Sequence, residues 1–177
     1  MSQRESLRAF QARLAERLQA AQARPLAAQW LAVQAGGRAC LLPLPQAGEI
    51  FPAAAPQPVP YVKPWFLGVA NLRGRLCGVI RLAHWLADSP LPAEAGQPAE
   101  EGSHLVALGE ALGVNAALRV DALAGLRSGS AFTGVLHAEA VRPPWLGACL
   151  ADGEGRAWQV LDLQALAADP AFLHIAA

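Results

Sequence analysis

The side chains best suited to nucleophilic or acid–base catalysis are scattered along this chain. The four histidines, which could act as general bases or metal ligands near neutral pH, are His84, His104, His137 and His174. The three cysteines lie far apart, with neither a CxxC motif nor a histidine at metal-site spacing, at Cys40, Cys77 and Cys149. The chain supplies no pair of nucleophile and base, no pair of carboxylates and no cluster of metal ligands at a recognised spacing. We therefore expect neither an enzyme nor a protein that binds a metal or a cofactor.

Two short glycine-containing segments are the nearest approach to phosphate-binding loops. They read Ser128-Gly129-Ser130 and Gly153-Glu154-Gly155. Both lack the strand-to-helix context and the additional residues that such loops need. We interpret both segments as turns.

Charge and composition exclude other classes of protein. The 14 basic and 14 acidic side chains cancel, so the chain lacks the positive field that attracts a nucleic-acid backbone. Apolar residues make up 54% of the 177 residues and charged residues 16%, enough to form a hydrophobic core and offset the entropy lost on folding. The cysteines are odd in number and far apart, which fits a reducing compartment. The N-terminal stretch lacks the apolar core of a secretion signal. We expect a cytoplasmic protein that does not insert into a membrane.

An amphipathic helix is predicted over residues 3–24, within an N-terminal segment that spans residues 1–26. Its apolar residues recur at steps of three and four, at Leu7, Phe10, Leu14 and Leu18, and Pro25 ends it. Five arginines against two glutamates give the helix a charge of +3. The helix either meets an acidic surface or packs on its own domain or on a second copy of the chain.

From residue 27 onward, short apolar runs alternate with turn residues, which is typical of β-hairpins. One hairpin is predicted over residues 30–44 around Gly36-Gly37, and another over residues 66–81 around Arg73-Gly74. The prolines between residues 52 and 64 predict an extended surface connection, because proline cannot donate a ladder hydrogen bond. Further strands are expected at residues 104–108, 115–120, 146–150 and 157–161, followed by a short helix over residues 163–168.

Residues 88–103 are rich in proline, glycine and glutamate, and they predict a flexible loop that separates two halves of similar pattern. Each half would form a small β-barrel of about 60 to 70 residues. Neither barrel would have much core alone, so we expect the two to pack against each other.

The most informative segment runs from residue 59 to residue 80 and reads VPYVKPWFLGVANLRGRLCGVI. Gly68 and Gly74 permit a close backbone approach or a positive φ, and Asn71 can hold a bend through a hydrogen bond to the backbone. Arg73 places a fork of hydrogen-bond donors at the bend. We expect this charged fork to have a partner group.

This segment resembles the signature of CheW-like domains, in which a proline and an apolar residue precede G-V-x-N-L-R-G and a strand that ends in V-I-D-L. The resemblance in pattern extends over residues 27–166. It implies an all-β fold of two packed five-stranded SH3-like β-barrel subdomains in residues 27–170. It also implies a non-catalytic adaptor that joins the cytoplasmic tip of a methyl-accepting chemoreceptor to the regulatory domain of a CheA-type histidine kinase, within membrane-associated receptor arrays.

The same resemblance implies how the partners bind. One barrel would dock edge to edge on the homologous barrel of the kinase, and a groove between the barrels would receive the receptor helix. Glu49, in Ala47-Gly48-Glu49-Ile50, matches the V-x-E-I segment of the family and is the expected ion-pair partner of Arg73. Two interpretations of this pair stay open, a local brace and a direct contact with a partner.

The candidate residues for partner binding, or for bracing the interface, are Glu49, Trp65, Phe66, Val69, Asn71, Arg73 and Gly74. Trp65 is the best interface candidate among the tryptophans, because it follows prolines on a surface connection where its burial must come from a nearby element or from a partner. The other four tryptophans are expected in the core or between the subdomains.

Two features depart from the common family pattern. Arg81 stands where V-I-D-L has its acid, so any ion pair made by that acid must be absent or reversed. Lys63-Pro64-Trp65 is most similar to the PilI branch of coupling proteins, which serves type IV pilus twitching motility. Two alternatives to an adaptor are a β-barrel that binds a small ligand in an apolar cavity and an enzyme with an unrecognised site.

Overall fold

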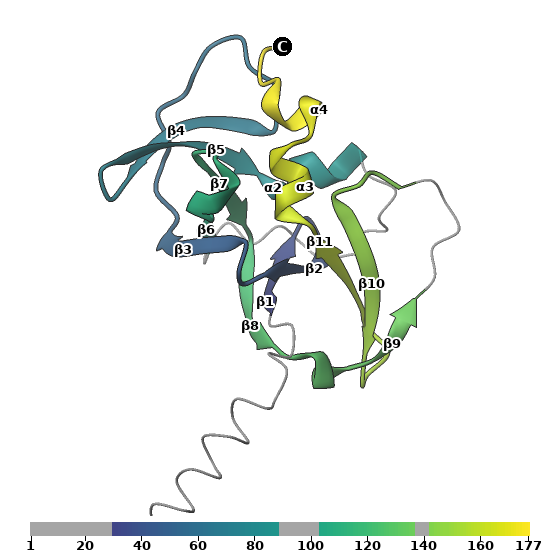
Figure 1. Cartoon of the computed structure of the whole chain (residues 1–177). Helices are drawn as coiled ribbons and strands as arrows, with labels where there is room; N and C mark the ends of the chain where they lie inside the picture. Colours follow the sequence, from purple (N-terminus) through teal and green to yellow (C-terminus); the bar gives the residue numbers. More distant parts are fainter. Residues whose placement is uncertain (1–29, 89–102, 137–141) are drawn as a thin grey trace, which may run out of the picture.

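The strands that the turn signals predict form two sheets in the computed structural model (Figure 1). The structure describes residues 30–88, 103–136 and 142–177. The helix predicted over residues 3–24, with its segment 1–26, lies outside the described residues. The loop predicted near residues 88–103 also lies outside them, apart from its two end residues.

The first sheet has six strands in the order β8-β1-β2-β11-β10-β9. They are β1 (Trp30–Ala35), β2 (Arg38–Pro43), β8 (Ala122–Arg127), β9 (Phe132–Leu136), β10 (Leu146–Asp152) and β11 (Ala157–Leu161). The turn between β1 and β2 has φ values of 58° at Gly36 and 71° at Gly37, which glycine adopts without a steric penalty. The predicted first hairpin is therefore confirmed.

The second sheet has five strands in the order β3-β6-β7-β5-β4. They are β3 (Ala47–Pro52), β4 (Phe66–Leu72), β5 (Arg75–Arg81), β6 (His104–Leu108) and β7 (Ala116–Val120). The hairpin predicted over residues 66–81 is confirmed, and its register pairs Leu72 with Arg75. The proline-rich connection before β4 makes an isolated bridge, between Gln57 and Val69, in place of a regular strand, as the missing proline donors require.

The expected all-β class is confirmed, with one sheet of five strands and another of six. The expectation that each subdomain is one half of the chain is wrong. Strands β3 to β7 form the five-stranded sheet, whereas the first two and the last four strands form the other. The cause is the parallel pairing of β2 with β11 and of β5 with β7, which joins distant segments and leaves no mark in local turn chemistry.

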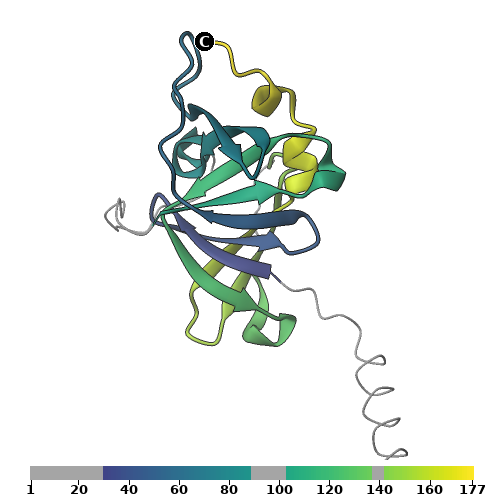
Figure 2. The same ribbon diagram turned by 90° about the vertical axis from the view of Figure 1, so that its left-hand side faces the viewer.

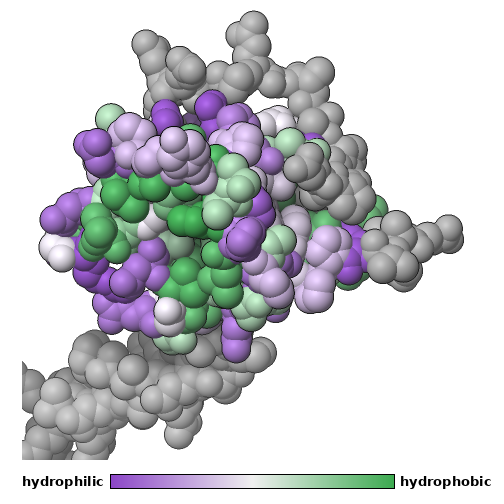
Figure 3. Space-filling model, turned by 90° about the horizontal axis from the view of Figure 1, so that it is seen from above, coloured by the Kyte–Doolittle hydropathy of each residue, from purple (hydrophilic) through white to green (hydrophobic). Residues whose placement is uncertain are grey.

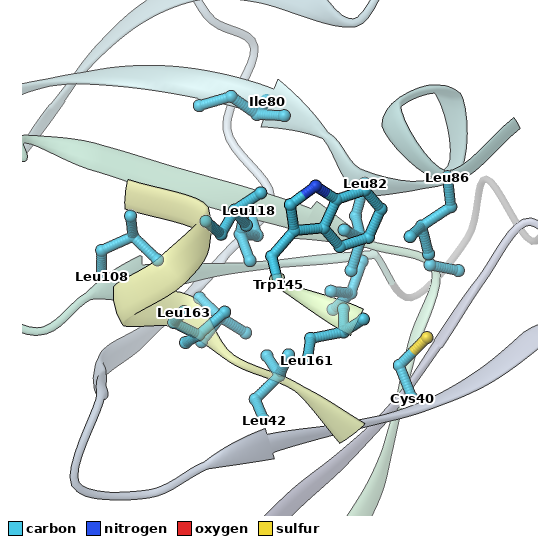
Figure 4. Packing of buried hydrophobic residues seen from close by; sticks show 14 of the residues in the cluster. Cys40, Leu42, Ile80, Leu82, Leu86, Leu108, Leu118, Trp145, Leu161 and Leu163 are labelled. Atoms are coloured by element: carbon cyan, nitrogen blue, oxygen red, sulfur yellow. The ribbon is translucent and has the colours of Figure 1, made fainter. Parts of the chain in front are cut away.

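Alternate residues of the central strands face different hydrophobic cores, because side chains along a strand point to opposite faces. In β2, Cys40 and Leu42 join the large core shared by both sheets, and Leu41 joins a core made only from the six-stranded sheet. In β7, Leu118 and Ala117 divide in the same way between the shared core and a core of the five-stranded sheet. Figure 4 shows residues of both sheets converging in the shared core. Strands buried on both faces read as nearly continuous apolar runs.

The remaining elements are short helices and 3-10 turns, and the C-terminal helices are drawn in yellow in Figure 2. They are α2 (Leu82–Trp85), α3 (Leu163–Ala167) and α4 (Pro170–Leu173), with 3-10 turns η1 (Leu86–Asp88), η2 (Glu110–Leu112) and η3 (Gly129–Ala131). The carboxylate of Asp162 caps α3, and Asp169 caps α4. Capping satisfies backbone N–H groups that the first turn of a helix leaves unpaired.

Candidate functional site

The bend between β4 and β5 is a two-residue turn formed by Arg73 and Gly74. Their φ values are 50° and 85°, and a type I′ hairpin turn requires a positive φ at both positions. The backbone N–H of Gly74 donates to Oδ1 of Asn71 at 2.7 Å, so the expected role of Asn71 in holding the bend is confirmed. Arg73 pays a steric cost in this left-handed conformation, because it has a Cβ atom. All three residues are exposed.

The predicted ion pair between Glu49 and Arg73 is present, with Arg73 Nη2 2.7 Å from Glu49 Oε1. Glu49 lies on β3 and Arg73 follows β4, the two edge strands of the five-stranded sheet. The pair therefore spans the two edges where this sheet curls toward closure. The side chains are 77% and 43% exposed, and exposed ion pairs contribute only about 0–1 kcal/mol. As a brace, this pair is weak.

A depression of about 310 Å³ lies beside the bend. A second charged group stands on its rim, where the guanidinium of Arg75 contacts Glu110 and donates to Asn115 Oδ1 at 2.7 Å. Its apolar lining includes Phe51, Leu72, Cys77, Leu108 and Val114. An apolar centre with a charged rim is the usual anatomy of a protein–protein interface. We call this depression, with Glu49, Arg73 and Arg75 on its rim, the bend surface.

The remaining predicted residues lie toward the opposite end of β4. Trp65 and Phe66 are buried, with 7% and 8% of their surface exposed, so Trp65 is covered by a nearby part of the chain, the first of the two expected sources of its burial. The reason is α4, a short helix that sequence reasoning missed, whose Phe172 stacks on Trp65 with ring centroids 6.1 Å apart. Val69 is half-buried and exchanges two backbone hydrogen bonds with Gln57.

Gly68 allows the proline-rich connection to approach β4 closely. Its φ is 131°, and a Cβ atom added there would lie 2.1 Å from the carbonyl oxygen of Gln57. The expected close backbone approach at this glycine is therefore confirmed. A Cβ atom added at Gly74 would have no other atom within 4 Å, so that glycine serves the turn conformation alone.

Arg81, which replaces the usual acid, uses its backbone N–H to bond the carbonyl of Trp65 at 2.8 Å. It lies opposite Arg119 in the parallel register of β5 and β7. Within the described ranges, the guanidinium of Arg81 forms no ion pair. The acid-to-base replacement therefore places two positive charges side by side.

The thiols and carboxylates of the described residues show no grouping suited to catalysis. Burial raises the pKa of the Cys40 thiol to about 12, which suppresses the reactive thiolate. The pKa of Asp152 is lowered, chiefly by a hydrogen bond from the Trp158 indole. The described part of the chain contains no group of three potential metal ligands and no helix long and apolar enough to cross a membrane.

Comparison with known proteins agrees with this architecture. The family profile described as the CheW-like domain matches residues 29–171. A similar solved structure is that of the scaffolding protein TtCheW from Thermoanaerobacter tengcongensis, with a TM-score of 0.59 and 14% identity, covering 76% of this chain and 88% of that one. At this identity the likeness concerns the fold alone. Among curated proteins, the comparison found no match.

Proposed function

Because the chain belongs to the CheW-like domain family, we propose that it is a non-catalytic adaptor in chemosensory signalling. It couples a methyl-accepting chemoreceptor to a CheA-type histidine kinase in the cytoplasm, in arrays beneath membrane-bound receptors. The Lys63-Pro64-Trp65 segment, similar to the PilI branch, supports a role in type IV pilus twitching motility. The alternative of a small-ligand β-barrel gains no support from the family match.

The observation that carries this proposal is the presentation of Arg73 at the bend. Its guanidinium is exposed, and its backbone keeps an unfavourable positive φ although glycine or asparagine would fit more easily. Strain of this kind persists at functional sites. The exposed ion pair contributes too little to account for it. We therefore assign the bend surface to contact with the receptor tip.

The kinase contact is proposed for the edges of the six-stranded sheet. Strands β8 and β9 are its outer strands, and both expose large apolar side chains, with Leu126 64%, Val135 56% and Leu136 43% exposed. Exposed apolar side chains on an outer strand add burial when a partner's strand docks against the sheet. This surface suits a homologous β-barrel of the kinase.

Reconstitution tests the proposal. The full chain is mixed with the regulatory domain of the CheA-type kinase and with a soluble receptor tip from the same organism, and complexes are measured by calorimetry and size-exclusion chromatography. Arg73→Ala should weaken receptor binding, and Val135→Glu should weaken kinase binding. Wild-type chain that binds neither protein would contradict the adaptor role. Intact twitching in a strain that lacks the protein would contradict the pilus assignment alone.

A further inference from the structure

A second depression, of about 450 Å³, lies near the end of β4 remote from the bend surface. We call it the tryptophan pocket, and its lining consists of Lys63, Trp65, Trp85, Pro143, Trp145, Asp169 and Ala171. Its three indoles come from the residue before β4, from the end of α2 and from the residue before β10. The face of the molecule that bears α4 shows apolar surface bordered by hydrophilic residues (Figure 3).

The aromatic wall of the tryptophan pocket is held in place by packing. Trp85 stands edge-on to Trp65, with ring centroids 5.0 Å apart, and is tilted against Trp145 at 5.8 Å. Phe172 stacks parallel to Trp65 at an interplanar angle of 1°. Trp65 and Trp145 are only 7% and 5% exposed. The rings therefore need no ordering before a ligand binds, which lowers the entropic cost of binding.

The tryptophan pocket already holds one cationic group. The ammonium of Lys63 lies over the Trp65 ring, 6.0 Å from its centroid, so this ring already presents a face to a positive group. Asp169 uses Oδ1 to accept from the N–H groups of Ala171 and Phe172, and within the described residues its Oδ2 accepts no hydrogen bond. The charges of Lys63 and Asp169 cancel, so the Trp65 ring face under Lys63 and the open Oδ2 of Asp169 are the two groups that can hold an incoming cation.

We propose that the tryptophan pocket receives an arginine side chain of a partner protein, with Lys63 covering the Trp65 face until that partner arrives. A planar guanidinium can stack on an indole face while an N–H at its edge donates to the open Oδ2 of the carboxylate, and an ammonium has no flat face to stack. Asp169 supplies the carboxylate and Trp65 the face. The assignment of this arginine to a partner protein rests on the proposed adaptor function.

The test uses the full chain labelled with ¹⁵N and follows its five indole N–H resonances during titration with N-acetyl-arginine methylamide. Resonances of Trp65, Trp85 and Trp145 should shift saturably. Trp30 and Trp158, which belong to the core of the six-stranded sheet, serve as internal references and should not move. N-acetyl-citrulline methylamide, a neutral isostere of the probe, should produce no saturable shift.

Two variants sharpen the test. Asp169→Asn keeps a good helix cap, since asparagine caps nearly as well as aspartate, and it should weaken binding roughly two- to five-fold by removing an exposed charge pair. Lys63→Gln removes the competing cation and should strengthen binding by a similar factor. Equal shifts with the citrulline probe, or unchanged affinity in both variants, would overturn the inference. If tetramethylammonium binds more tightly than the arginine probe, the assignment to an arginine side chain is overturned.

These results separate the inference from the adaptor proposal. A chain that binds kinase and receptor but shows no arginine-dependent indole shift overturns the tryptophan pocket alone. If the indole resonances shift in a chain that binds neither protein, the pocket is a cation site and its assignment to a partner protein is overturned.

Discussion

Replacing Arg73 with asparagine should weaken receptor binding while leaving the stability of the fold nearly unchanged. The substitution removes an ion pair whose side chains are 77% and 43% exposed. It also places at φ 50° a residue type that tolerates the left-handed region. The perturbation thus separates a brace from a partner contact.

The expected stability change follows from two opposing effects. Loss of the exposed ion pair with Glu49 lowers the free energy of unfolding by about 0–1 kcal/mol. Relief of the left-handed strain at Arg73 raises it by about 1 kcal/mol. The net change in the free energy of unfolding lies within about 1 kcal/mol of zero. For a domain of this size that corresponds to a shift of roughly 2–4 °C or less in Tm.

The assay compares wild type, Arg73→Asn, Glu49→Gln and the double variant by urea unfolding, and measures the affinity of each for the receptor tip by calorimetry. The double-mutant cycle isolates the coupling between the two side chains, and we expect less than about 1 kcal/mol. The Glu49→Gln variant is the matched control, because it removes the pair without touching the bend.

If the Tm of Arg73→Asn falls by more than about 6 °C, which corresponds to roughly 2 kcal/mol, the ion pair stabilises the fold and its interpretation as a brace is correct. Unchanged receptor affinity at unchanged Tm would remove Arg73 from the contact. Either outcome would show that the strained turn has another cause.

Four further substitutions test the packing, the turn and the titrating groups. Gly68→Ala should lower the free energy of unfolding by roughly 3 kcal/mol or more, because its Cβ would clash with backbone at 2.1 Å. Gly74→Ala has open space around it and should lower the free energy of unfolding, measured with urea, by only about 1 kcal/mol. Burial raises the pKa of Cys40 from 9.0 to about 12. The contribution of this thiol to the free energy of unfolding is therefore full below pH 9 and falls by about 4 kcal/mol as the pH rises to about 12. A Cys40→Ala variant should lack this loss, and identical pH profiles of stability in the variant and the wild type would contradict the burial. The hydrogen bond from Trp158 lowers the pKa of Asp152, so its contribution is present above pH 3.8 and is lost as the pH falls through the folded pKa; Asp152→Asn should flatten that acid limb of a thermal-unfolding series.

Hairpins were predictable from the sequence where the turn chemistry is local. Gly36-Gly37 and Arg73-Gly74 both mark tight turns, and the strands on either side follow from their apolar runs. The Glu49 pairing came through the family resemblance, since the two residues belong to opposite edges of a sheet. No local pattern relates one edge to the other.

Other features were hidden because tertiary contacts create them. Strand β9 has four exposed residues out of five, so it lacks the alternation that indicates a half-buried strand. The burial of Trp65 depends on Phe172 in a helix of four residues, too short to show helical periodicity. The parallel partner of β2 is β11, near the other end of the chain.

That last pairing has a consequence for the chain during its synthesis. The β1–β2 hairpin leaves the ribosome long before β11, whose Gln159 and Val160 pair with Cys40 and Leu41. Until then the apolar edge of β2 has no partner, and unpaired edges invite aggregation and proteolysis. A premature stop anywhere before Leu161 would release a polypeptide that cannot complete its six-stranded sheet, so we expect cells to degrade such truncated products.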